Sequence, residues 1–193
     1  MHFDDGFYTW VTDLAHRTPG PVDTLIALWS DYGLALFAVL MVLAWWRARP
    51  LGTVRTAMAL AAPFVVVAPY AVNDLFKAVV HEQRPCQTLH TLTVEACPPL
   101  GDWSFPSNHA AIAAAAAAAV LLTDRKLGAI AVPAALLMAA SRVWVGAHYP
   151  HDVVVGLVVG ALVGLVLTLA ARRAAPFVER LGDTRLRPLV TGR

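Results

Sequence analysis

Long apolar blocks, separated by short stretches rich in proline, glycine and charge, dominate the chain. A helix needs roughly 20 mostly apolar residues to cross the hydrocarbon core of a bilayer. Five blocks meet or approach that length, and we expect a spanning helix in each: Thr24–Trp46, Thr53–Val72, Ser107–Thr123, Leu127–Val145 and Asp152–Ala171. The pattern predicts one all-α domain over residues 1–193, with a polytopic membrane helix bundle over residues 24–171.

The first 19 residues follow a different pattern. Apolar side chains recur at helical spacing in Met1–Pro19, while Asp4, Asp5 and Asp13 occupy other positions. This pattern is typical of an amphipathic helix that lies in the membrane interface. Since the segment has neither a basic start nor an uninterrupted apolar core, it does not resemble a secretory signal peptide.

Composition supports a membrane protein. Of the 193 residues, 58% are hydrophobic and 15% are charged, whereas charged residues make up about 25% of a typical soluble domain. An ordinary soluble domain is therefore excluded, and we expect a lipid bilayer as a partner, with no nucleic acid. The oligomeric state is left open by the sequence.

The distribution of Lys and Arg predicts the orientation of the bundle. If five helices alternate, 11 of the 15 basic residues fall on one side: in the first connection, in the third connection and in the tail 172–193. Short cytoplasmic loops carry an excess of Lys and Arg, so we expect this side to face the cytoplasm. The loops Lys77–Pro106 and Arg142–His151 then lie outside.

Unusual polar clusters interrupt the apolar pattern at the outer ends of the spans. They occur in the stretches "NDLFKAVVHEQRPC", "FPSNHA" and "SRVWVGAHYPHD". Ionisable groups near bilayer depth are costly, and their presence there indicates a functional site. The clusters contribute one set of residues to the same membrane face: Lys77, Arg84, Ser107, His109, Arg142, His148 and Asp152.

Three cations with a single carboxylate among them predict a phosphate site. The guanidinium groups of Arg84 and Arg142 match phosphate oxygens in pairs, and Lys77 adds a point charge. Ser107 follows Pro106 at the start of an expected helix, where free backbone N–H groups favour an anion.

The two histidines can supply the chemistry. His148 precedes Asp152 by four residues, so the carboxylate can accept one ring N–H and leave the other nitrogen free to attack phosphorus. His109 is placed to protonate the leaving oxygen and then to activate water. The arrangement requires no metal or other cofactor.

The motifs Lys-x6-Arg-Pro, "PSNH" and Ser-Arg-x5-His-x3-Asp resemble the three signature motifs of the type 2 phosphatidic acid phosphatase superfamily. The chain is most similar to the bacitracin-resistance type of undecaprenyl pyrophosphate phosphatase, a bacterial family. The resemblance implies that His148 is the nucleophile that forms a phosphohistidine, His109 the acid and base, and Asp152 the partner of His148.

For substrate binding, the resemblance implies that Lys77, Arg84 and Arg142 hold phosphate, assisted by Ser107 and the backbone at Asn108. Many members have Gly at the position of Asn108, and the bacitracin-resistance type commonly has Asp. The expected enzyme is a plasma-membrane phosphatase with its active site outside the cytoplasm, which cleaves a polyprenyl pyrophosphate to the monophosphate and recycles carrier lipid. Other lipid phosphates, and a transporter or anion-binding protein, remain alternatives.

Several residues beside the site receive structural interpretations. Cys86 and Cys97 lie in the outer loop, where an oxidising exterior permits a disulfide, but the sequence leaves their pairing open. We expect Glu82 to pair with a nearby cation and His151 to be a solvated loop residue. The spacing of Gly156, Gly160 and Gly164 predicts close helix packing within the monomer.

Overall fold

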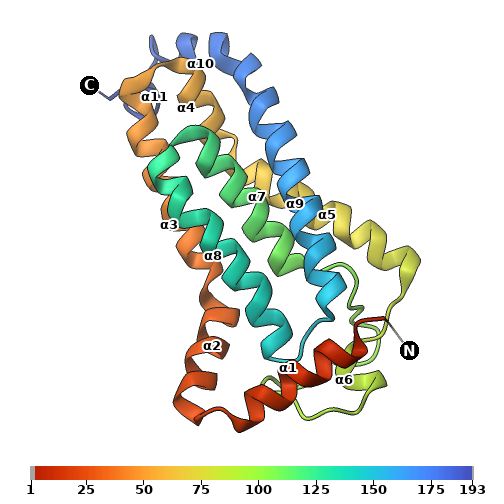
Figure 1. Cartoon of the computed structure of the whole chain (residues 1–193). Coiled ribbons are helices and arrows are strands. Elements are labelled where there is room, and N and C mark those ends of the chain that lie inside the picture. The colour runs from red at the N-terminus through yellow and green to blue at the C-terminus, as the bar shows by residue number, and fades with distance from the viewer. Residues whose placement is uncertain (1–2, 193) are drawn as a thin grey trace.

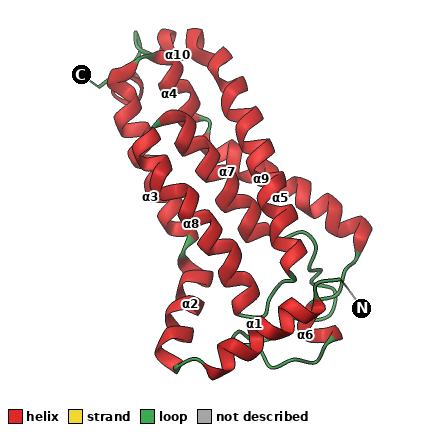
Figure 2. Ribbon diagram, in the orientation of Figure 1, coloured by secondary structure: helices red, strands yellow, loops and turns green. Residues whose placement is uncertain are grey.

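The computed structural model describes residues 3–192, and within them all regular structure is helical (Figure 2). The α-helices are α1 (Asp5–Arg17), α2 (Gly20–Tyr32), α3 (Leu34–Ala48), α4 (Thr53–Leu60), α5 (Ala62–Val80), α6 (Pro85–Thr88), α7 (Asn108–Thr123), α8 (Arg125–Trp144), α9 (Pro150–Ala170), α10 (Ala175–Leu181) and α11 (Arg187–Val190). Two 3₁₀ turns, η1 (Arg49–Leu51) and η2 (Ala171–Ala174), join α3 to α4 and α9 to α10.

The multi-pass bundle predicted from the apolar blocks is confirmed. Four helical segments among the described residues are long and apolar enough to cross a membrane: Leu34–Leu51, Thr53–Thr88, Arg125–Trp144 and Pro150–Leu181. Helix α7 is apolar but has only 16 residues. It lies at the centre, with α3, α5, α8 and α9 packed around it (Figure 1).

Small side chains explain how α7 can be enclosed so tightly. Most of the alanines in α7 are buried, and α9 presents glycines to it. A Cβ atom added at Gly160 would collide with the backbone of Ala111, and one at Gly164 would approach that of Ala115. The predicted glycine packing is therefore confirmed, and it fixes the helix that begins at Asn108 against the helix that begins at Pro150.

Two expected spans are divided in the structure. The expected span Thr24–Trp46 consists of α2 and α3, which meet at Gly33. The Gly33 carbonyl accepts a hydrogen bond from the backbone N–H of Leu36, three residues later, whereas in an α-helix the donor is four residues later. The second expected span consists of α4 and α5, which separate at Ala61, two residues before Pro63. Proline lacks the N–H that would continue the helical hydrogen bonds, so it favours the start of a new helix.

The second span also ends later than expected. We predicted its end at Val72 and a loop from Lys77, but α5 continues to Val80 and is capped by His81 in a left-handed conformation. The polar residues after Val72 do not end the helix, because one of them, Asn73, is fully buried and donates a hydrogen bond to the Ser107 carbonyl. Lys77 is consequently held on a helix.

Helix α1 lies across the end of the bundle at which α7 begins (Figure 1). Phe7, Trp10 and Leu14 are exposed, as expected for a helix that meets the membrane interface. The opposite face is packed on the protein, and Tyr8 donates a hydrogen bond to the Gly146 carbonyl at 2.9 Å. Val11 belongs to this buried face. Met1 and His2 lie outside the described residues.

The predicted tail is largely helical within the described residues, and Arg193 lies outside them. Val178 of α10 and Val190 of α11 pack with Ala57 of α4. Helices α1 and α11 thus lie at opposite ends of the bundle (Figure 1).

Candidate active site

A cavity of about 310 Å³ lies at the end of α7 where that helix begins. It gathers six of the eight predicted site residues, which come from three stretches of the sequence: Lys77, Arg84, Asn108, His109, Arg142 and His148. Tyr70, Pro98, Asp102 and Ile112 complete the lining. Three cations and one carboxylate therefore face this cavity, which suits it to an anionic group.

His148 is held in a loop between α8 and α9 and is almost fully buried. The preceding turn depends on Gly146, whose φ of 85° lies in a region that favours glycine. The Nδ1 atom of His148 lies 3.2 Å from Oδ2 of Asp152, and Nε2 lies 3.1 Å from Nη1 of Arg84. Because a guanidinium can only donate, Nε2 must accept, and the ring proton is on Nδ1.

The environment of His148 favours the neutral imidazole. Burial lowers its pKa to about 3, although the hydrogen bond to Asp152 acts in the opposite direction. Nearby Arg84 also lowers this pKa, because a second positive charge beside the ring is unfavourable. The ring nitrogen next to the cavity therefore carries a lone pair.

Asp152 is fully buried in the first turn of α9 and does not line the cavity. Its Oδ2 atom accepts a hydrogen bond from the Tyr149 backbone N–H at 2.9 Å and another from the Ser104 hydroxyl. Its carbonyl accepts from the Ser107 N–H at 3.1 Å. Ser104 was missed by the sequence analysis, although it lies only three residues before the predicted Ser107.

Arg84 precedes the short helix α6 and is anchored from several directions. Its Nη2 atom lies 3.0 Å from Oδ1 of Asp102, Nε donates to the Asp102 carbonyl, and Nη1 donates to the Ala147 carbonyl at 2.8 Å. A disulfide joins Cys86 to Cys97, which answers the question left open by the sequence. This crosslink closes the loop directly after Arg84.

Arg142, in the last turn of α8, is buried and paired with Glu95 of the outer loop, with Nη1 3.2 Å from Oε2. The same nitrogen donates to the Ser30 hydroxyl of α2. Lys77 donates to the Trp103 carbonyl at 2.6 Å. Glu95 and Ser30 were not singled out by the sequence, because a long loop and a separate helix bring them to Arg142.

Of the three predicted site residues at the start of α7, only two line the cavity. His109 and Asn108 line the cavity. The Ser107 side chain is fully buried outside the lining, and its hydroxyl has no hydrogen-bond partner among the described residues. The first backbone N–H groups of α7 have no carbonyl of their own helix to bond, and such groups favour an anion.

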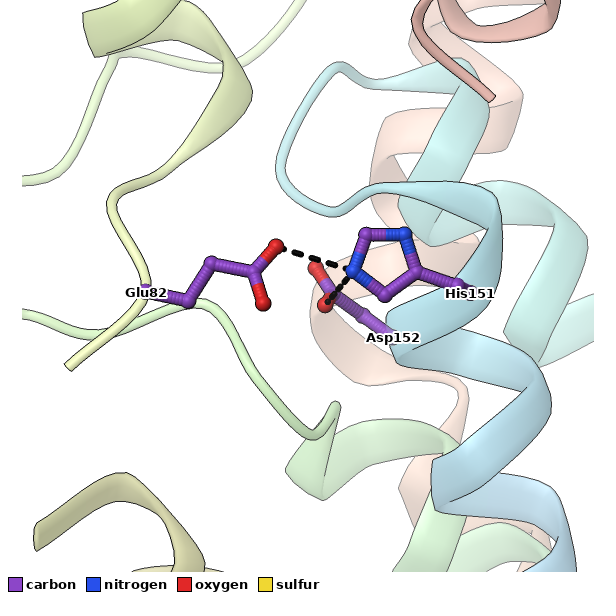
Figure 3. A group of neighbouring side chains, drawn as sticks. All are labelled: Glu82, His151 and Asp152. Carbon is purple, nitrogen blue, oxygen red and sulfur yellow. Dashed lines mark hydrogen bonds and ion pairs between the residues drawn. The ribbon is translucent and has the colours of Figure 1, made fainter. Parts of the chain in front are cut away.

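His151 does not lie in a solvated loop, as we had expected. It belongs to the first turn of α9, and only 15% of its side chain is exposed. Nδ1 lies 2.9 Å from Asp4, and Nε2 lies 2.9 Å from Glu82, with Asp152 on the same side of the ring (Figure 3). The partner that we predicted for Glu82 is this imidazole.

A second cavity, of about 790 Å³, lies at the opposite end of α7. Its cationic lining comes from the connections and the tail that we assigned to the cytoplasm: Arg47, Arg55, Arg125, Lys126 and Arg172. It is larger than the first cavity, but none of the predicted site residues line it.

Comparison with known proteins agrees with the family that the motifs indicate. The model of the PAP2 superfamily matches residues 58–175. The chain belongs to the PAP2 superfamily. This PAP2 protein is 32% identical over 160 residues to the undecaprenyl-diphosphatase BcrC of Bacillus subtilis, which covers 82% of the chain and 79% of that relative.

Two further relatives match shorter regions of this PAP2 protein. The decaprenylphosphoryl-5-phosphoribose phosphatase of Mycobacterium tuberculosis is 39% identical over 100 residues, which cover 51% of the chain and 52% of the relative. The lipid A 1-phosphatase of Rhizobium johnstonii is 30% identical over 114 residues, 57% of the chain and 46% of the relative. No solved structure matches the chain. The family and these relatives identify a multi-pass PAP2 lipid phosphatase, a hydrolase.

Proposed function

We propose that this PAP2 phosphatase hydrolyses a polyprenyl diphosphate to the monophosphate and thereby returns carrier lipid to cell-envelope synthesis. The observation that carries the proposal is the shared cavity: His148, Arg84, Lys77 and His109 all line it, and Nε2 of His148 lies 3.1 Å from Nη1 of Arg84. The substrate class follows the undecaprenyl-diphosphatase BcrC of Bacillus subtilis, a relative whose match covers 82% of the chain.

In the proposed reaction, the terminal phosphoryl group enters between the cations and takes over the hydrogen bond that Arg84 gives to His148. Nε2 of His148 then attacks phosphorus while the bond to the bridging oxygen breaks. His109 donates a proton to that oxygen, and the lipid monophosphate leaves. Asp152 accepts a hydrogen bond from Nδ1, which keeps its proton, and the carboxylate stabilises the positive charge that develops on the ring.

The second step returns the enzyme to its first state. Water attacks the phosphohistidine, His109 accepts one of its protons, and the phosphorus–nitrogen bond breaks to release inorganic phosphate. Arg84, Arg142 and Lys77 stabilise the charge on the transferring group in both steps. All of these roles are taken by residues of the chain itself.

The decisive experiment measures phosphate release and the phosphoenzyme together, with purified protein in detergent and excess chelator. The substrates are a polyprenyl diphosphate, a polyprenyl phosphosugar, phosphatidylglycerol phosphate and phosphatidate. We expect fastest release from the diphosphate and an acid-labile, base-stable phosphoenzyme after rapid quenching.

His148→Ala should lose both turnover and the phosphoenzyme, whereas His90→Ala provides a matched control because His90 is exposed in the outer loop. Faster release from the phosphosugar would indicate a substrate like that named for the mycobacterial relative. Normal turnover by His148→Ala would refute the nucleophile.

We further propose that the catalytic cavity faces away from the cytoplasm, since the cationic cavity lies at the other end of α7. Single cysteines at the exposed positions His90 and Arg125 can test this proposal in intact cells. A membrane-impermeant thiol reagent should label the variant His90→Cys and spare Arg125→Cys. The reverse pattern would overturn the orientation.

A further inference from the structure

Three carboxylates surround the imidazole of His151, and none of these residues lines the cavity that contains His148. Asp4 comes from the segment before α1, Glu82 from the loop after α5, and Asp152 from α9. Glu82 and His151 are partly buried, and Asp152 is fully buried. If the imidazole of His151 takes up a second proton, its positive charge compensates only one of the three carboxylate charges. The cluster therefore remains negative and favours a cation.

The ligand atoms have a spacing that suits a small metal ion. Nε2 of His151 lies 2.9 Å from Oε1 of Glu82 and 3.4 Å from Oδ1 of Asp152, and the three atoms lie within 4.8 Å of one another (Figure 3). In a tetrahedral zinc site with bonds of about 2.1 Å, neighbouring ligand atoms are about 3.4 Å apart.

A buried carboxylate oxygen points independently to a ligand. Oδ2 of Asp152 binds Ser104, Tyr149 and His148. Oδ1 is buried and has no hydrogen-bond partner among the described residues, although Nε2 of His151 lies 3.4 Å away. A buried charged oxygen in that state is unfavourable unless a cation or donor reaches it.

Asp4 contacts the other ring nitrogen of His151. Both of its carboxylate oxygens lie near Nδ1 of His151, at 3.0 and 2.9 Å, and Oδ2 also accepts the His151 backbone N–H at 2.8 Å. The contact of Nε2 with Glu82 requires a proton on Nε2. When a metal ion replaces that proton, an imidazole that donates from Nδ1 to a carboxylate coordinates the ion through Nε2, which is the usual support of a histidine that binds metal.

We propose that Glu82, His151 and Asp152 bind a divalent cation of the Zn²⁺ class, with Asp4 orienting the imidazole. The donor set of one nitrogen and two carboxylate oxygens leaves a fourth position for water. The ion itself takes no part in the reaction, and Glu82 and His151 lie outside the lining of the phosphate-binding cavity. Because the ion shares Asp152 with His148, it withdraws charge from the carboxylate that orients the nucleophile and inhibits turnover, a consequence that rests on the proposed function.

Metal binding can be measured without any substrate. Full-length protein in detergent, freed of its affinity tag and of metal, is titrated with Zn²⁺ in the presence of excess Mg²⁺, and bound zinc is counted by elemental analysis. Co²⁺ provides a second signal, because tetrahedral coordination gives intense visible absorption. We expect one ion per chain. Wild-type protein that retains no zinc and shows no cobalt bands would mean that the cluster is an ion-pair network, and it would overturn the proposal.

Substitutions assign the ion to this cluster. Glu82→Gln and His151→Gln keep side-chain size and should each weaken Zn²⁺ binding by more than about 100-fold, while Asp4→Asn should weaken it by about 10- to 100-fold. His90→Gln is the matched control and should bind as the wild type does. Wild-type affinity in Glu82→Gln would overturn the assignment. If that variant does not fold, unchanged affinity in Asp4→Asn is the overturning result.

Inhibition of turnover by Zn²⁺ allows the cation site and the proposed phosphatase activity to be tested separately. Zn²⁺ should reduce turnover of the wild type with the same midpoint as binding, and chelator should restore it. Turnover in chelator does not depend on the cation site, so a protein that hydrolyses the lipid and binds no zinc would refute only the cation site. Zinc binding at Glu82 without turnover would refute only the phosphatase mechanism.

Discussion

The hydroxyl of Ser104 donates a hydrogen bond to Oδ2 of Asp152, the oxygen that also lies 3.2 Å from Nδ1 of His148. The carboxylate is thereby fixed by a loop before α7 as well as by the first turn of α9. A positioned carboxylate holds an attacking imidazole in the correct tautomer. Ser104 is therefore a positioning residue for the proposed nucleophile.

Replacement of Ser104 should affect the chemical step more than substrate binding. We expect Ser104→Ala to lower kcat by about 10- to 100-fold with little change in KM, because small misplacement of a reacting group has effects of that size. Asp152→Asn should lower kcat by about 10⁴-fold. Steady-state kinetics and the rate of phosphoenzyme formation provide the measurements. A rise in KM with unchanged kcat would show instead that Ser104 acts in binding.

The buried imidazole of His148 predicts how stability depends on pH. Its pKa is about 3 in the folded protein, below the value of about 6.5 for an exposed histidine. The unfolded chain therefore binds a proton at His148 where the folded chain does not. The contribution of this group to stability is fully present above pH 6.5 and is lost progressively as pH falls toward 3.

Thermal unfolding of wild type and His148→Asn in detergent, from pH 7.5 to pH 5, tests this linkage. The wild type should lose more stability than the variant as pH falls, because Asn has no proton to bind. Carboxylates titrate in both proteins and cancel in the comparison. Parallel curves for the two proteins would contradict a neutral, buried His148.

The ion pair of Glu95 and Arg142 predicts that loss of the Glu95 side chain destabilises the folded protein. Arg142 is buried, and Nη1 of its guanidinium lies 3.2 Å from the Glu95 carboxylate. Glu95→Ala should reduce the free energy of unfolding by about 3 kcal/mol, since it leaves a buried cation without its partner. Asp13→Ala, at an exposed position of α1, is the control and should have little effect. Equal melting temperatures for the two variants would show that Glu95 does not support Arg142.

The disulfide between Cys86 and Cys97 should stabilise the loop that carries Arg84. The two residues are 11 positions apart, and closing a loop of that length is worth about 3 kcal/mol. Replacing both cysteines by serine should lower the melting temperature, and it should raise KM because Arg84 is less firmly held. Reductant should shift the wild type toward the double variant and leave the double variant unchanged. A shift of both proteins by reductant would point to another cause.

The sequence by itself determined the membrane bundle and most of the residues that face the substrate cavity. Apolar blocks near the length of a bilayer crossing leave few alternatives to spanning helices, because backbone polar groups must be satisfied within lipid. The three motifs carry unusual charges at span ends, so Lys77, Arg84, His109, Arg142 and His148 could be predicted before their distances were known.

Only the tertiary structure decided the partners of those residues. Ser104, Glu95, Asp102 and Asp4 come from loops and a terminal segment, and no periodic pattern marks a loop side chain that meets a residue far along the chain. The break at Gly33 and the extension of α5 beyond Val72 depend likewise on packing. Local pattern fixes which segments are helical, whereas the pairing of buried charges depends on which segments the folded bundle brings together.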